Sequence, residues 1–160
     1  MGRMEVKIDD LSHPDVAALL AIHLGDMRDH SPEDGVHALD VDRLRQPELT
    51  FLTAWDGGSL LACGALKDLG GAQGTLGTAG EIKSMRTHPD HLRKGAARAI
   101  LAHIVETARN RGYARLSLET GSGPVFDAAI GLYEAFGFER GEAFADYETN
   151  DFSRFFHLDL

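Results

Sequence analysis

Hydrophobic and polar residues alternate with two different periods along this chain of 160 residues. Residues 4–8 alternate as a short strand. The apolar runs 50–55 and 59–69 flank the sequence DGG, which is typical of a β-hairpin because glycine supplies the positive φ of a tight turn. Further runs with strand character span residues 81–87, 114–119, 138–144 and 155–160. The pattern predicts seven short strands.

Four other segments repeat their apolar residues at helical spacing, and two of them precede the hairpin. The first begins at His13-Pro14-Asp15 and the second at Ser31-Pro32, since proline is tolerated in the first turn of a helix. The third spans residues 91–111 and the fourth spans residues 125–136. The sequence therefore predicts four helices among the strands.

The order of these elements predicts the fold class. The third helix lies between the strands 81–87 and 114–119, so the three form a βαβ-like unit. Residues 70–80, rich in Gly, Ala and Thr, predict a mobile connector before this unit. The chain has the length of one ordinary domain, and we expect residues 1–160 to form a single domain of the α/β (α+β) class.

Composition argues against several classes of function. The formal net charge is -9, whereas nucleic-acid and anionic-membrane binding need a cationic face. The single cysteine, Cys63, cannot form an internal disulfide, and no cysteine pair has zinc-ligand spacing. The longest apolar run, residues 16–22, is too short to cross a membrane. With no signal-peptide pattern at the N-terminus, we expect a cytoplasmic protein without a metal.

Basic residues are concentrated at one place in this acidic chain. Residues 83–98 contain five basic side chains and one acid, a local balance of +4 that leaves -13 for the remainder. They surround the predicted start of the third helix, where small residues leave the unpaired amides accessible. Such a terminus favours a phosphate group. The P-loop and G-x-G-x-x-G motifs are absent, so neither explains the site.

Residues 85–98 read MRTHPDHLRKGAAR, which resembles motif A of the GNAT acetyltransferase superfamily, V-x-P-x-x-R/Q-x-x-G-x-G/A. Residues 129–138, AIGLYEAFGF, are similar to the family's A-x-x-L-Y-x-x-x-G-F segment. Leu92 replaces the family's Arg or Gln, and Phe126 replaces an Asn that often precedes the family tyrosine by seven residues. The resemblance covers most of the chain and implies a mixed central sheet of about seven strands with about four helices, splayed between the fourth and fifth strands.

The resemblance also implies the activity and the cofactor site. It implies an enzyme that moves an acetyl group from acetyl-CoA directly to a primary amine of a small molecule or peptide, as a homodimer. Together with the composition, this leaves no metal, nucleic acid or membrane as an expected partner. The backbone of Met85, Arg86 and Thr87 would align the pantetheine arm. The pyrophosphate would lie against the amides of Arg93, Lys94, Gly95, Ala96, Ala97 and Arg98.

Acetyl transfer to an amine requires a base, because an aliphatic ammonium must lose a proton before it attacks. The resemblance implies Glu81 in one branch of the family and Glu119 in another, and we favour Glu81. Tyr133 would donate a proton to the departing thiolate, and a backbone N–H near Arg86 would stabilise the oxyanion. Residues 144–155 either border the acceptor pocket or form a polar hairpin loop.

Other functions fit the same residues. A non-catalytic acyl-CoA-binding or sensing module would share the fold, and an acyltransferase acting on a hydroxyl or with another acyl-CoA would share the site. An acyl-enzyme at Cys63 ranks lower, because a lone cysteine in an apolar strand is more often a small core residue. The acidic remainder of the chain favours a cationic amine as acceptor.

Overall fold

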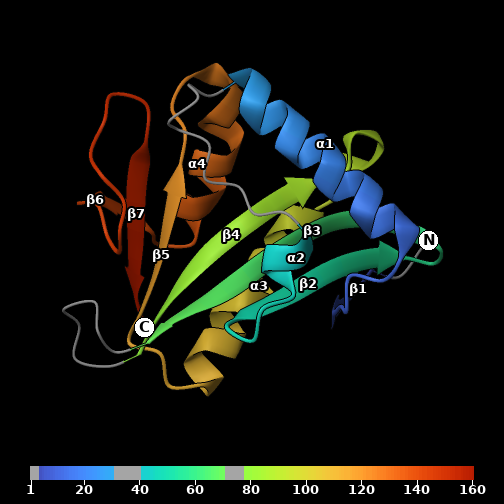
Figure 1. Cartoon of the computed structure of the whole chain (residues 1–160), viewed down its shortest axis with the longest axis horizontal. Coiled ribbons are helices and arrows are strands. Elements are labelled where there is room, and N and C mark those ends of the chain that lie inside the picture. The colour runs from blue at the N-terminus through green and yellow to red at the C-terminus, as the bar shows by residue number, and fades with distance from the viewer. Residues whose placement is uncertain (1–3, 31–40, 71–77) are drawn as a thin grey trace.

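The computed structural model describes residues 4–30, 41–70 and 78–160. Within them, one mixed sheet has the strand order β1-β2-β3-β4-β5-β7-β6, as the sequence predicted in number and class (Figure 1). The strands are β1 Met4–Ile8, β2 Leu49–Asp56, β3 Ser59–Gly70, β4 Ala79–Thr87, β5 Arg115–Thr120, β6 Glu139–Gly141 and β7 Arg154–Asp159. The helices are α1 Pro14–His30, α2 Val41–Leu44, α3 Ala96–Asn110 and α4 Asp127–Ala135.

The sheet opens between its fourth and fifth strands. All neighbouring strands are antiparallel except β4 and β5, which are parallel and joined by α3, so the predicted βαβ unit is confirmed. Their pairing runs from Ala79 opposite Arg115 to Ile82 opposite Leu118, and then stops although both strands continue. Figure 1 shows β4 and β5 diverging from this point. The splay implied by the family resemblance is therefore present.

The two faces of the sheet bury separate cores, because successive side chains of a strand point to opposite faces. Helices α3 and α4 cover one face and α1 and α2 the other (Figure 1). The core under α3 and α4 includes Ile82, Ile100, Ile104, Leu116 and Tyr133. The core under α1 and α2 includes Val16, Leu20, Leu44, Phe51 and Cys63.

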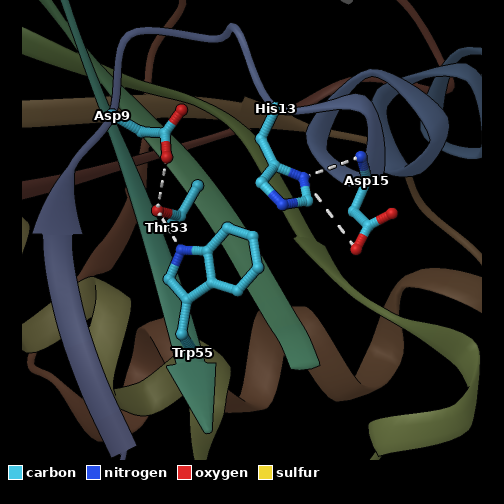
Figure 2. Close-up of polar contacts among 5 residues, drawn as sticks. All are labelled: Asp9, His13, Asp15, Thr53 and Trp55. Carbon is cyan, nitrogen blue, oxygen red and sulfur yellow. Dashed lines mark hydrogen bonds and ion pairs between the residues drawn. The ribbon is translucent and has the colours of Figure 1, made fainter. Parts of the chain in front are cut away.

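A polar network fixes the start of α1 over the sheet (Figure 2). Asp9 Oδ2 accepts a hydrogen bond from Thr53 Oγ1 at 3.1 Å, and Thr53 Oγ1 accepts one from Trp55 Nε1 at 2.8 Å. His13 meets the Trp55 ring edge-on, with centroids 4.9 Å apart, and its Nδ1 accepts from the Asp15 amide at 3.0 Å. The junction of β1 and α1 is thereby tied to β2, and this holds α1 in place beside β4.

The predicted start of the third helix was wrong. Instead of beginning at residue 91, α3 begins at Ala96, after a short 3-10 helix Pro89–His91. Arg93 and Gly95 between them have φ of 62° and 82°, a left-handed conformation that a right-handed helix cannot contain. Leu92, predicted on the apolar side of the helix, is 59% exposed. These residues form a loop that leads into the helix.

The bounds of the fourth and sixth strands also differ from the predictions. Most of the predicted second helix, residues 31–40, lies outside the described residues, and so does most of the predicted connector, residues 71–77. Strand β4 begins at Ala79, inside that connector, because Ala79 already pairs with Arg115. The sixth strand is confined to Glu139–Gly141.

Candidate active site

Glu81 lies buried at the centre of the sheet, with 2% of its surface exposed. Its neighbour Ile82 points into the core under α3, so Glu81 faces the side of α1. Glu81 Oε2 accepts hydrogen bonds from Lys83 Nζ at 3.2 Å and from the Tyr147 hydroxyl at 2.5 Å. Lys83 Nζ also donates to the Tyr147 oxygen at 2.7 Å. We call Glu81, Lys83 and Tyr147 the carboxylate triad.

The second predicted base, Glu119, lies at the same opening. Because Ile82 and Leu118 form the last pair of β4 and β5, Lys83 and Glu119 are the first residues beyond the point where the strands part. Glu119 is half-buried, and its charge contributes to the raised pKa of Tyr147. The structure therefore places Glu119 at the same opening as the carboxylate triad.

Tyr147 was not among the predicted catalytic residues. Burial, followed by the charge and hydrogen bond of Glu81 and the charge of Glu119, raises the pKa of this phenol well above its usual value. The hydroxyl thus remains a hydrogen-bond donor at neutral pH. The sequence signal was only the open choice at residues 144–155, and the contact with Glu81 favours a segment that borders the site.

Tyr133 lies on the other face of the sheet, in the core under α3 and α4. Its ring meets Phe138 edge-on with centroids 6.0 Å apart, and burial raises the pKa of its phenol. Its hydroxyl makes no hydrogen bond to any residue that the structure describes. Glu81 and Tyr133 therefore approach the opening of the sheet from opposite faces.

Strand β4 carries a bulge at this opening. Arg86 pairs with Cys63 and Lys83 pairs with Ala65, so Ser84 and Met85 together stand opposite one residue of β3, Gly64. A Cβ on that glycine would lie 2.6 Å from Met85 Sδ, so only glycine allows this approach. The β5-facing edge of residues 83–87 has no strand partner in the described chain, which leaves Met85, Arg86 and Thr87 able to pair with an extended ligand.

The loop of residues 92–95 before α3, which we call the amide loop, presents a continuous run of backbone amides. The first helical hydrogen bond runs from the Ala99 amide to the Gly95 carbonyl at 3.0 Å. For the amides of residues 92–98, no acceptor is found among the described residues. A Cβ placed on Gly95 would meet nothing within 4 Å. Free donors around open space at a helix N-terminus fit a pyrophosphate.

The predicted basic cluster divides into two parts. Lys83 pairs with Glu81, and Arg86 pairs with Asp26 of α1, so both charges are balanced within the protein. Arg93, Lys94 and Arg98 remain exposed beside the amide loop. The local balance of +4 is thus not the field of one site, because only three of the five cations are exposed near the start of α3.

Cys63 is buried, and burial raises the pKa of its thiol to about 12. We expect the native protein to resist iodoacetamide near neutral pH, because the thiolate is the reactive form. The urea-unfolded protein should be labelled rapidly, as measured by intact mass. Rapid labelling of the native protein would restore Cys63 as a candidate nucleophile.

The described residues contain neither a candidate metal centre nor a candidate membrane span. In residues 4–30, 41–70 and 78–160, no three His, Cys, Asp or Glu side chains gather as metal ligands do. None of the helices of the same residues is both long and apolar enough to cross a bilayer.

Comparison with known proteins identifies the family. The family model described as "Acetyltransferase (GNAT) family" matches residues 16–138, which include the amide loop, Glu81 and Tyr133. The chain belongs to the GNAT acetyltransferase family. It is an acyltransferase by family, and the expectation from motif A is confirmed.

Individual relatives agree with this membership. This GNAT acetyltransferase is 52% identical over 144 residues to the uncharacterized N-acetyltransferase YsnE of Bacillus subtilis, covering 90% of this chain and 91% of the relative. A solved structure from Klebsiella pneumoniae, provisionally named an acyl-CoA N-acyltransferase, has a TM-score of 0.78 with 26% identity and covers 98% and 97% of the two chains. A Bacillus subtilis acetyltransferase in complex with CoA shares the fold, with a TM-score of 0.71, 17% identity and 99% coverage of both chains.

Proposed function

We propose that residues 1–160 act as one acetyl-CoA-dependent N-acetyltransferase, which transfers the acetyl group directly to a primary amine of a small molecule or peptide. The observation that carries the proposal is the placement of Glu81 and Tyr133 on opposite faces of the opening between β4 and β5. The single cysteine suits the reducing cytoplasm, and the family resemblance favours a homodimer.

The residues at the opening fit acetyl-CoA in two places. The amides of residues 92–98 lack acceptors in the described chain and would hold the pyrophosphate, with Arg93 and Lys94 beside the phosphates. The unpaired edge of β4 at Met85, Arg86 and Thr87 would bind the pantetheine arm as an added strand. Together these contacts would place the thioester at the opening.

Glu81 acts as the general base in this proposal. The acceptor approaches from the α1 side, loses its ammonium proton to Glu81 directly or through water, and attacks the acetyl carbonyl carbon with its free electron pair. A backbone N–H of the β4 bulge stabilises the oxyanion. Glu119 lies at the same opening and is the alternative base.

Tyr133 assists the leaving group from the other face. When the carbon–sulfur bond breaks, its electron pair leaves with sulfur, and the Tyr133 hydroxyl donates a hydrogen bond to the thiolate. Since burial raises the pKa of Tyr133, the phenol is protonated when needed. The thiolate finally takes a proton from Tyr133 or solvent, and the second proton that the attacking nitrogen loses passes to solvent and replaces it. The products are the N-acetyl amide and CoA.

The alternative is a module that binds acyl-CoA without catalysis. A thermal-shift assay with acetyl-CoA, followed by thiol release across a panel of primary amines and alcohols, separates the two. Our proposal expects stabilisation by acetyl-CoA and acceptor-dependent thiol release with amines. Stabilisation without release for any acceptor favours the module, and release with alcohols alone would assign the acceptor as a hydroxyl.

Tyr133→Phe should lower kcat at least about tenfold, because one donor to the departing thiolate is lost. CoA affinity should change little, since the ring and its contact with Phe138 are retained. Steady-state kinetics and calorimetry measure the two quantities. An unchanged kcat would remove Tyr133 from the mechanism.

A further inference from the structure

We propose that Tyr147 is a positioning residue, which together with Lys83 holds one oxygen of Glu81 so that the other faces the acceptor amine. The proposal rests on the proposed function and adds a residue that the family motifs do not include. The two oxygens of the buried Glu81 carboxylate differ in their hydrogen bonds.

Both hydrogen bonds to Glu81 end on the same oxygen. Lys83 Nζ donates to Oε2 at 3.2 Å and the Tyr147 hydroxyl donates to Oε2 at 2.5 Å, while Lys83 Nζ also reaches the Tyr147 oxygen at 2.7 Å. The carboxylate oxygen, the ammonium group and the hydroxyl thus form a closed triangle of hydrogen bonds. Because the side chain is buried, these charge-assisted bonds fix the plane of the carboxylate.

The second oxygen, Oε1, is in a different situation. It accepts no hydrogen bond from any residue in the described part of the chain. Three described side-chain atoms are fully buried without a hydrogen-bond partner, namely His23 Nδ1, Ser84 Oγ and Arg86 Nε. Glu81 Oε1 is not one of them. A carboxylate fixed through one oxygen, with the other unpaired, is suited to receive a proton.

The segment that carries Tyr147 is itself anchored to the sheet. His157 Nε2 donates to the Glu142 carbonyl at 2.8 Å, since a carbonyl can only accept, and His157 Nδ1 shares a hydrogen bond with Ser117 Oγ at 2.7 Å. At the other end, Ser122 Oγ donates to the Phe152 carbonyl at 2.7 Å. The Tyr147 hydroxyl is therefore held at Glu81 by the fold of residues 142–153.

The ionisable groups around the triad come from several elements. Lys83 is on β4 with Glu81, Glu119 is on β5, and His157 on β7 lies across Ser117, the residue paired with Glu81. Arg86 on β4 and Asp26 on α1 form their own ion pair farther along the strand. Among these groups, Lys83 and Tyr147 bond Glu81 directly.

Tyr147→Phe tests the proposal, because it removes the hydroxyl but keeps the ring against Phe144 and Phe155 and under Lys83 Nζ. We expect kcat to fall about tenfold or more with the KM for acetyl-CoA unchanged. The rise of rate with pH should move to higher pH, since the ionised carboxylate loses a donor. Tyr113→Phe is the matched control and should behave as wild type, because Tyr113 is a buried tyrosine of the core under α3 and α4, on the face of the sheet opposite Glu81.

A readout without turnover separates this proposal from the proposed function. In protein labelled with ¹³C-glutamate, the Glu81 carboxyl resonance, assigned with Glu81→Gln, should titrate at higher pH in Tyr147→Phe than in wild type. If wild type transfers no acetyl group, the proposed function fails while this titration still tests the triad. An unmoved resonance overturns the positioning role, and so does an unchanged kcat in an active enzyme.

Discussion

Glu81→Gln is expected to lower kcat by about 10²- to 10⁴-fold, the range for loss of a positioned general base. The rise of rate with pH should shift towards the pKa of the free amine, near 10, because the variant must wait for spontaneous deprotonation of the acceptor. Stopped-flow or steady-state thiol release across pH measures both effects. The binding of CoA should persist, since the amides of residues 92–98 are untouched.

Glu119→Gln is the matched control for this prediction. Both carboxylates lie at the point where β4 and β5 part, and Glu81 accepts hydrogen bonds from Lys83 and Tyr147 within the triad. We expect Glu119→Gln to keep a near wild-type profile. If Glu119→Gln shows the large loss and Glu81→Gln does not, Glu119 is the base. Thermal unfolding of both variants should be recorded, because Glu81→Gln leaves the buried Lys83 without its carboxylate.

Gly95→Val is expected to abolish measurable CoA binding. Gly95 has φ of 82°, a conformation that a β-branched residue adopts only under strain, and an isopropyl group would occupy the open space before the amides. Isothermal titration calorimetry with CoA measures the loss. Normal affinity in a folded Gly95→Val protein would place the pyrophosphate elsewhere.

The control for backbone strain lies at the other end of the same helix. Gly112 has φ of 79°, and a Cβ there would also meet nothing within 4 Å. Gly112→Val therefore imposes similar strain, roughly 1–2 kcal/mol, far from the amide loop. We expect it to lower the melting temperature while CoA affinity stays near that of wild type.

Periodicity was sufficient to predict the order of the strands and helices. The predicted elements were observed at residues 4–8, at the DGG turn and in the βαβ unit. In each, the pattern of apolar residues largely matches the side that the structure buries. The predicted start of α3 was wrong because Leu92, an apolar residue at helical spacing, lies in a loop. The positive φ angles of Arg93 and Gly95 set the course of that loop. The spacing of apolar residues carries no information on whether a residue adopts a left-handed backbone conformation.

The candidate site was predictable only where a motif carried it. The motifs indicated Glu81, Glu119 and Tyr133, and the structure brings the two glutamates together with Tyr133 across the sheet. Tyr147 is 66 residues from Glu81 in the chain, and no spacing rule connects them. The same holds for Arg86, whose charge is balanced by Asp26 of α1. Long-range pairs of this kind appear only when the strands and helices are placed.

The structure of a crystal grown with acetyl-CoA, or with CoA and an amine, tests the central claim most directly. We expect the pyrophosphate against the amides of residues 92–98, the pantetheine arm along Met85, Arg86 and Thr87, and the thioester in the opening between β4 and β5. Glu81 Oε1 should face the acceptor side, and the Tyr133 hydroxyl should lie within hydrogen-bond distance of the sulfur. A cofactor bound outside this opening, or a sulfur remote from Tyr133, would contradict the account.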